Sequence, residues 1–148
     1  MIKIMFVCHG NICRSPMAEY VLKSMVMKQG RADEFTIVSS ATSTEEIGNP
    51  IHQGTKHKLA AAGVPTDNRR AVQLRKSDYN KYDYFIGMDN YNVENMLRML
   101  GSDPKNKVCR LLDFTDTPRN IADPWYTGDF DLTYNDIVEG CTALLKQL

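Results

Sequence analysis

The sequence predicts an α/β fold with three layers, in which a doubly wound, four-stranded parallel sheet carries helices on both faces. Four short apolar segments, 2–7, 35–39, 84–88 and 107–112, have the length and composition of buried strands. Segments with apolar residues at helical spacing separate these strands. Strands that alternate with helices are typical of a parallel sheet with right-handed crossovers. In such sheets ligands bind beyond the carboxyl ends of the strands.

The size and charge of the chain limit its organisation and its partners. Its 148 residues predict one domain, 1–148, large enough to bury a core without disulfides or metals. Lysine plus arginine equals aspartate plus glutamate, at 18 each, so no net charge favours nucleic acid or a membrane surface. No apolar run is long enough to span a bilayer, and the apolar start of the chain is typical of a strand rather than an export signal. Four cysteines without regular spacing then indicate reduced thiols and a cytoplasmic protein.

The first strand and helix are predicted from the start of the chain. Segment 2–7 is apolar almost throughout, as expected for a strand buried on both faces. Ser15 and Pro16 match the N-cap and first position of a helix, and Gly30 matches its end.

The second strand, at 35–39, is followed by a polar loop at 42–48. Asn49 and Pro50 repeat the cap-and-proline pattern and predict a helix that ends near 62–63. Proline, Asx and arginine residues then make 63–73 mostly loop.

The second half of the chain begins with a short helix at 77–82 and the third strand at 84–88. Asp89 or Asn90 is predicted to cap the following helix, which Gly101 ends. The fourth strand, 107–112, leads to a predicted loop at 113–131; stretches of that length in compact domains are often functional. The apolar face of the last helix comprises Ile137, Val138, Cys141, Leu144 and Leu145.

The segment from Cys8 to Ser15 joins the first strand to the first helix and has the clearest chemical signal. Gly10 and Asn11 are the residue types that best tolerate a left-handed backbone, so this turn can aim several N–H groups at one point. With a helix N-terminus behind it, that point is predicted to bind an anion. The positive potential favours a thiolate at Cys8, and Arg14 can grip phosphate oxygens in pairs. These residues predict a thiolate nucleophile facing a bound oxyanion.

The motif Cys8-x5-Arg14-Ser15-Pro16, with Gly10-Asn11-Ile12-Cys13 inside it, resembles the phosphate loop of low-molecular-weight protein tyrosine phosphatases. The run CHGNICRSPMAE near the start of a chain of this size makes the resemblance specific, and later matches extend it over nearly the whole chain. The resemblance implies attack of Cys8 on phosphorus to give a cysteinyl-phosphate, without a metal or other cofactor. It also implies phosphate binding by the loop residues His9, Gly10, Asn11, Ile12, Cys13 and Arg14.

Arg14 lies in the predicted first turn of a helix, which is an unfavourable position for a cation. The helix dipole disfavours a cation in the first turn, so an arginine there indicates an anion that it binds. Its planar fork can hold the equatorial phosphoryl oxygens more tightly in the transition state than in the ground state, which lysine could not match.

Asp123 is the candidate donor of the proton that a leaving phenolate needs. An Asp-Pro pair alone is a weak signal, and Asp103-Pro104 predicts only a turn. Trp125 and Tyr126, however, complete an Asp-Pro-aromatic-aromatic run that the resembled family carries late in the chain, with the aspartate as general acid. Carried over, Asp123 protonates the leaving oxygen and then activates the hydrolytic water, while the two aromatic residues wall the cleft and stack on the substrate ring. The alternative is an ordinary exposed turn with its aromatics in the core.

Three residues are expected to support the loop. Ser15 can cap the helix and also hydrogen-bond the sulfur of Cys8. Ser39 matches a family serine that supports the loop asparagine, here Asn11. Asp89 matches a family acid near the loop, with a plain N-cap as an equal alternative.

The other three cysteines can be explained by packing, and one of them also by a redox role. Cys13 matches a family cysteine that can form a reversible disulfide with the nucleophile, and simple packing is compatible with that role. A zinc site at Cys8, His9 and Cys13 is disfavoured because paired-ligand spacing is lacking. Cys109 and Cys141 fit core positions.

Two departures from the family pattern bear on support and specificity. Gly63-Val64-Pro65 is followed by Asn68, where many relatives have a histidine that buttresses the loop serine. Glu45 lies where relatives often place an aromatic wall of the cleft, which hints at a different specificity. A basic cluster comprising Arg69, Arg70, Arg75 and Lys76 is typical of a solvated surface.

The sequence as a whole predicts a monomeric phosphotyrosine monoester hydrolase that acts on phosphotyrosine proteins and has a tyrosine kinase as a partner. Three alternatives stay open. The first is an arginine phosphatase of the same family, although those relatives tend to have threonine where this chain has Ile12. The second is an arsenate reductase on the same fold, which needs a downstream cysteine pair that Cys109 and Cys141 do not resemble. The third is a phosphopeptide-binding module without catalysis, which would not need both Cys8 and Asp123.

Overall fold

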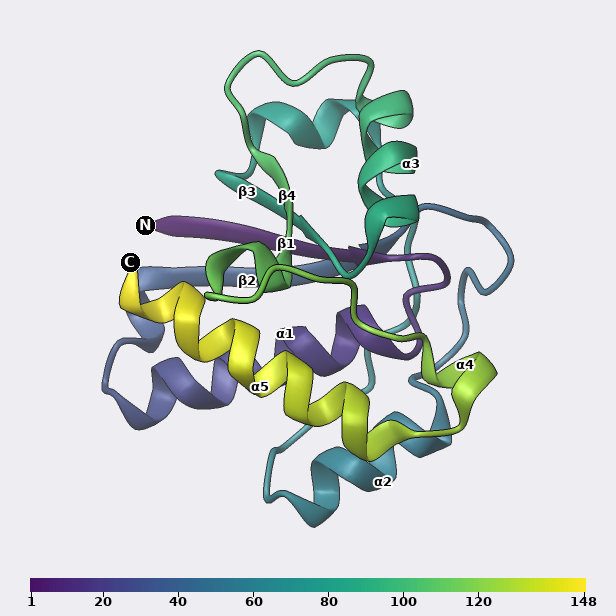
Figure 1. Ribbon diagram of the computed structural model, residues 1–148, viewed down its shortest axis with the longest axis vertical. Coiled ribbons are helices and arrows are strands. Elements are labelled where there is room, and N and C mark those ends of the chain that lie inside the picture. The colour runs from purple at the N-terminus through teal and green to yellow at the C-terminus, as the bar shows by residue number, and fades with distance from the viewer.

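The computed structural model describes residues 1–148 and has a parallel sheet between two layers of helices (Figure 1). The strands are β1 (Ile2–Cys8), β2 (Phe35–Ala41), β3 (Tyr84–Gly87) and β4 (Val108–Arg110). They are arranged in the order β2-β1-β3-β4, and all three pairings are parallel. The predicted doubly wound α/β architecture with four parallel strands is therefore confirmed.

The helices divide between the two faces of the sheet. Helices α1 (Arg14–Lys28), α2 (Gln53–Ala61) and α5 (Phe130–Lys146) lie on one side, and α3 (Asn90–Leu100) lies on the other (Figure 1). None of the helices combines the length and the apolarity needed to cross a membrane.

Alternation along the central strand β1 explains this arrangement, because successive side chains point to opposite faces. Ile4 and Phe6 belong to a core cluster of 23 buried residues that includes residues of α1 and α5. Met5 and Val7 belong to a second cluster of 7 buried residues that includes residues of α3. Both faces of β1 are therefore buried, as its apolar composition predicts.

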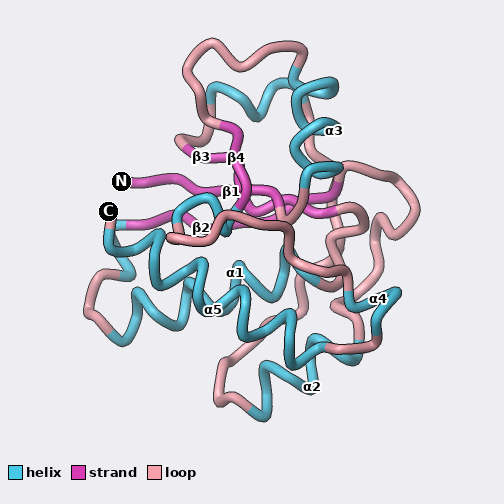
Figure 2. Tube along the Cα trace, viewed as in Figure 1, coloured by secondary structure: helices cyan, strands magenta, loops and turns pink.

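The register of the sheet brings three chain segments to one edge. Cys8 pairs with Ala41 of β2, and Val7 pairs with Gly87 of β3. The residues just after β1 and β3 and the end of β2 therefore meet at the carboxyl edge, where the loops and the short helix α4 (Pro124–Thr127) also lie (Figure 2). This edge is where the topology predicts a ligand site.

Two of the predicted helix starts are wrong. Helix α1 begins at Arg14, with Cys13 at the cap position and no side-chain cap bond, so Ser15 is not the N-cap. Helix α2 begins at Gln53 rather than after the Asn49-Pro50 pair. His52 caps it instead, because its Nδ1 accepts a hydrogen bond from the Gly54 N–H at 3.0 Å.

The chain around the fourth strand is also more structured than predicted. Strand β4 is short because Leu111–Phe114 forms a 3₁₀ helix, in which the Arg110 N–H donates to Asp113 at 2.8 Å. The predicted loop at 113–131 contains α4 and the start of α5, whose N-caps are Asp123 and Asp129. Polar cap residues and Pro124 at the first position made these helices resemble loop by composition.

Smaller differences concern lengths. Strand β2 continues two residues beyond 35–39 to Ala41, and the short helix predicted at 77–82 is a 3₁₀ helix at Lys76–Asn80. The cap of α3 at Asp89 and its end at Gly101 are confirmed.

Candidate active site

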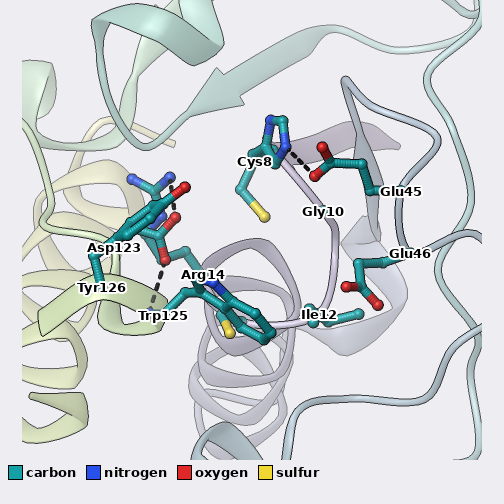
Figure 3. Close-up of a pocket in the computed structure, with 11 residues that line it drawn as sticks. Cys8, Gly10, Ile12, Arg14, Glu45, Glu46, Asp123, Trp125 and Tyr126 are labelled. Carbon is teal, nitrogen blue, oxygen red and sulfur yellow. Dashed lines mark hydrogen bonds and ion pairs between the residues drawn. The ribbon is translucent and has the colours of Figure 1, made fainter. Parts of the chain in front are cut away.

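The loop between β1 and α1 wraps around the sulfur of Cys8 (Figure 3). The backbone N–H of Asn11 donates to Cys8 Sγ at 3.3 Å, and Ser15 Oγ lies 3.0 Å from the same sulfur. Asn11 has a φ of 60°, the left-handed conformation expected there, which turns its N–H back toward Cys8. The Asn11 N–H and the Ser15 hydroxyl are therefore both placed to donate to this sulfur.

The side chain of Asn11 links the loop to α1 and to β2. Its Nδ2 donates to Ser15 Oγ at 2.7 Å and to Ser39 Oγ at 2.9 Å. Because Ser15 Oγ accepts from Asn11, its own proton can point at the sulfur of Cys8. The structure thus brings Ser15 and Ser39 to the loop asparagine. Glu19, which the sequence analysis did not single out, accepts from Ser39 at 2.5 Å and completes the network.

Arg14 is 2% exposed and lies at the floor of the site among acidic groups. Its Nη1 donates to Asp89 at 2.7 Å and to the carbonyl oxygen of Ile121 at 2.8 Å. Its Nη2 lies 3.4 Å from Asp123, a long contact for an ion pair, so this end of the fork is held only loosely by the protein. The Nε and Nη2 donors are the ones available to an oxyanion.

Charge at the site keeps this guanidinium protonated. Burial alone lowers the pKa of Arg14, but the negative charges of Cys8, Asp89 and Asp123 together raise it above its ordinary value. Asp89 has both of the roles considered for it, since its Oδ1 accepts from the Asn92 N–H at 2.8 Å and caps α3 while its Oδ2 binds Arg14.

Asp123 reaches the site from the far end of the chain. It caps α4 by accepting the Trp125 N–H at 3.0 Å, and Pro124 follows at the first helical position. The Asp-Pro pair therefore does more than make a turn, because it fixes the carboxyl beside Arg14 and directs the next two side chains. Asp103, in contrast, accepts from the Lys107 and Val108 N–H groups in a turn remote from the site, as predicted.

A cleft of about 100 Å³ opens above these groups. Its walls include Trp125 and Tyr126, which are 57% and 83% exposed, so the aromatic pair is not part of the core. Figure 3 shows Trp125 and Tyr126 on the side of Asp123, with Glu45 and Glu46 on the opposite side. The lining residues are Cys8, His9, Gly10, Ile12, Cys13, Arg14, Glu45, Glu46, Asp123, Trp125 and Tyr126.

The opposite wall is acidic. Glu45 Oε2 lies 2.6 Å from His9 Nε2 and ties the 42–48 loop to the phosphate loop. Glu46 was not predicted as a residue of the cleft, although its neighbour Glu45 was. A Cβ at Gly10 would lie 3.3 Å from Cγ of Glu46, so a side chain at position 10 would require a small shift of Glu46 at this wall.

The other cysteines have different surroundings. Burial, with negative charge at Cys8 and Asp123, raises the pKa of Cys13 to about 12, so Cys13 is a neutral thiol at physiological pH. Cys141 is fully buried, as predicted, whereas Cys109 is only half-buried and packs against the core. All four cysteines are unpaired, and no three side chains of metal-binding type are grouped around a common point.

Support for the loop comes from a residue that the sequence analysis placed on the solvated surface. Asn68, at the position of the expected histidine, is exposed. Arg69 turns inward instead, and its Nη1 donates to the carbonyl oxygen of Asn11 at 2.8 Å. Composition could not distinguish Arg69 from its basic neighbours, because the signal is the contact itself.

Comparison with known proteins identifies relatives over the whole chain. The family model described as low molecular weight phosphotyrosine protein phosphatase matches residues 3–148. The low molecular weight protein-tyrosine-phosphatase YfkJ of Bacillus subtilis is 36% identical over 100% of this chain and 96% of its own. Its crystal structure superposes with a TM-score of 0.96, covering 99% of this chain and 94% of that one.

Two further solved structures show how widely this fold is used. SP-PTP, a low molecular weight protein tyrosine phosphatase from Streptococcus pyogenes, has a TM-score of 0.90 and 42% identity, over 100% of this chain and 93% of its own. The Drosophila arginine phosphatase DARP has a TM-score of 0.89 and 28% identity, over 99% and 97% of the two chains. The fold is therefore shared by proteins named for two different phosphorylated side chains.

Proposed function

Because the chain belongs to the low molecular weight protein-tyrosine-phosphatase family, we propose that it hydrolyses phosphotyrosine monoesters in proteins through a cysteinyl-phosphate on Cys8. The observation that carries the proposal is the meeting of three groups at one small cleft: the sulfur of Cys8, the guanidinium of Arg14 and the carboxyl of Asp123. They supply a nucleophile, an oxyanion clamp and a proton donor, which are the three functions that the reaction requires. We propose residues 1–148 as one catalytic domain.

In the first step, the thiolate of Cys8 attacks phosphorus, and the bond between phosphorus and the phenolic oxygen breaks. Asp123 gives its proton to that oxygen, so tyrosine leaves as the neutral phenol. The equatorial oxygens gain their strongest contacts in the transition state, from the loop N–H groups between His9 and Arg14 and from the free end of the Arg14 fork.

In the second step, water attacks the phosphorus of the cysteinyl-phosphate. Asp123, now a carboxylate, accepts a proton from that water, and the bond from sulfur to phosphorus breaks to release phosphate and the Cys8 thiolate. The long 3.4 Å contact with Arg14 leaves Asp123 free to serve both steps.

The preference for an aryl ester is supported by the residues at the mouth of the cleft. Trp125 and Tyr126 present exposed rings beside Asp123, where the ring of phosphotyrosine can stack. Ile12 supports the same choice, because it adds an apolar group to the cleft lining at the position where arginine phosphatases tend to have threonine.

The setting of the reaction follows from its chemistry. We propose a cytoplasmic enzyme, because a thiolate nucleophile needs a reducing compartment and all four cysteines are unpaired. We also propose that it acts as a monomer, because one chain supplies every residue that lines the cleft. Its substrates would be phosphotyrosine proteins, and a tyrosine kinase, as the enzyme that makes them, would be a partner.

A kinetic comparison of matched peptides tests the substrate class. Wild-type enzyme is given one peptide sequence carrying either phosphotyrosine or phosphoarginine, with Cys8→Ser as the control for contaminating phosphatase. We expect kcat/KM to favour phosphotyrosine by more than about 100-fold, a preference that a site built for one substrate readily reaches. Equal or higher kcat/KM for phosphoarginine would replace the proposal with the arginine phosphatase alternative.

A further inference from the structure

Arg69 is a half-buried cation directed at the loop that surrounds Cys8. Its Nη1 donates to the carbonyl oxygen of Asn11 at 2.8 Å, and its Nη2 donates to Asn11 Oδ1. No carboxylate oxygen lies within the 4.0 Å of an ion pair with this guanidinium, in contrast to Arg14. The hydrogen bonds of this half-buried guanidinium go to uncharged oxygens of Asn11, so its charge is offset only by negative groups farther away.

We propose that Arg69 is a positioning residue for catalysis: it fixes Asn11 in the left-handed conformation that binds the Cys8 sulfur, and its charge favours the thiolate. The negative charges that favour the charged form of Arg69 include those of Glu19 and, at the site itself, of Cys8. The inference rests on the proposed function, since it concerns how the nucleophile is prepared.

Asn11 is the residue through which Arg69 acts, because its hydrogen-bonding capacity is fully used. Its Oδ1 accepts from Arg69 and from the Val72 N–H at 3.1 Å, and its Nδ2 donates to Ser15 and Ser39. Asn11 is 0% exposed, so all partners of its amide group come from the protein. The two donors on the Oδ1 side decide the orientation of the amide, which directs Nδ2 toward the hydroxyl beside the sulfur.

Two hydrogen bonds from Arg69 define the conformation of Asn11. Asparagine tolerates the left-handed backbone at φ 60° well, and its side-chain hydrogen bonds help to hold it there. Arg69 binds the carbonyl oxygen and the side chain of Asn11 together, which fixes the backbone and the amide of this residue relative to each other. A single-point donor such as lysine cannot make this pair of bonds.

The segment that carries Arg69 is itself anchored to α1. Asp67 accepts from the Tyr20 hydroxyl and from the Arg69 N–H, the latter at 3.1 Å. This anchor turns the side chain of Arg69 inward, whereas Arg70 remains exposed and its nearest acceptor is the Gly48 carbonyl oxygen at 3.5 Å.

Arg69 keeps its charge in this position. Burial lowers the pKa of Arg69, and the negative charges of Glu19 and Cys8 counter part of that effect. A guanidinium remains protonated at any physiological pH, so its positive charge is permanent.

Arg69→Met and Arg70→Met make a matched pair, because each removes one positive charge from adjacent positions. The readout is the rate of Cys8 alkylation by iodoacetamide as a function of pH, with Cys8 identified by peptide mapping. For Arg69→Met we expect the midpoint of this profile to rise by about one pH unit, the low end of the effect of one nearby charge. We also expect kcat for nitrophenyl phosphate to fall about tenfold. Arg70→Met should match wild type in both measurements.

A purely structural role for Arg69 would lower thermal stability without moving the alkylation profile. Arg69→Met that is folded, with unchanged midpoint and kcat, would therefore overturn the proposal. If that variant does not fold, Arg69→Lys decides the question, because it keeps the charge but loses the pair of hydrogen bonds to Asn11. We then expect kcat to fall several-fold, and a wild-type kcat would refute the positioning role of Arg69. Alkylation needs no substrate, so it decides the role of Arg69 even if the enzyme proves inactive on phosphotyrosine.

Discussion

Replacing Asp123 with asparagine separates the chemical role of this residue from its structural one. Asp123 accepts the Trp125 N–H through one oxygen and lies 3.4 Å from Arg14 through the other. Asparagine retains an oxygen for the cap of α4 but has no proton to give to a leaving phenolate. Alanine would lose both, and the loss of the cap alone would cost about 0.5–2 kcal/mol.

The expected loss follows from the role of general acid. Positioned proton transfer contributes about 10²- to 10⁴-fold, which corresponds to about 2.7–5.4 kcal/mol of transition-state stabilisation. For tyrosine phosphate the loss of rate should reach this range, because the tyrosine hydroxyl has an ordinary pKa of about 10 and its anion is a poor leaving group. It should be small for nitrophenyl phosphate, whose leaving anion is already stable.

The assay is single-turnover release of the two phenols by Asp123→Asn, compared with wild type. The control is Asp129→Asn, the same substitution at the N-cap of α5, where the aspartate accepts the Leu132 N–H at 2.9 Å and does not line the cleft. An equal loss on both esters would refute the assignment of Asp123 as proton donor.

Three further predictions concern the cleft wall, the packing and the cysteines. Trp125→Ala should raise KM for an aryl phosphate several-fold but leave the inhibition constant of inorganic phosphate unchanged, because phosphate does not use the wall; Tyr91→Ala, exposed on α3, is the control, and parallel changes in both constants would contradict stacking. Gly54→Ala should lower the free energy of unfolding by about 1–3 kcal/mol, since its Cβ would lie 2.3 Å from the ring of Phe130; denaturant titration against exposed Lys56→Ala measures it, and equal stability would show that the ring moves freely. The pKa of Cys13, raised from 9.0 to about 12, predicts stability that is lost as pH rises from 9 towards 12, because the unfolded thiol ionises there first; buried Cys109 contributes to the same loss, so Cys13→Ala should lessen the slope in part, and an unchanged slope would exclude Cys13 as one of its sources.

The fold could be predicted from the sequence because its signals are local. Each strand is a short apolar segment, and the alternation of strands with helices determines a parallel sheet. The carboxyl edge of that sheet then places Cys8 at the ligand site without any further information. The boundaries were less predictable: α4 is a single turn, and residues such as Asp123 and Pro124 are as common in loops as at helix starts.

The candidate site was predictable where a residue type has one strong reason to be in its position. Arg14 in a first helical turn implies an anion, and Asp123 with two aromatic residues after it matches a specific family pattern. Ser15 shows the limit of such reasoning, because the sequence predicted both a helix cap and a hydrogen bond to the sulfur of Cys8, and the structure has only the second.

Residues that act through long-range contacts could not be found from the sequence. Glu19 lies on α1 with the spacing of an ordinary exposed acid, yet it is 6% exposed and accepts from Ser39. Arg69 is one of four cations in a stretch that looks solvated, yet it contacts Asn11, 58 residues away. Such contacts depend on which face of a loop turns inward, and the anchor between Tyr20 and Asp67 decides that only after folding.

In the proposed reaction the sulfur of Cys8 carries the phosphoryl group between substrate and water. Rapid acid quench of wild-type enzyme and of Asp123→Asn with excess nitrophenyl phosphate, followed by mass spectrometry of the peptide that contains Cys8, measures this directly. We expect one added phosphoryl group on Cys8, accumulating further in Asp123→Asn because the water of the second step has lost its base. Full turnover without phosphate on this peptide, or with phosphate on His9 instead, would contradict it.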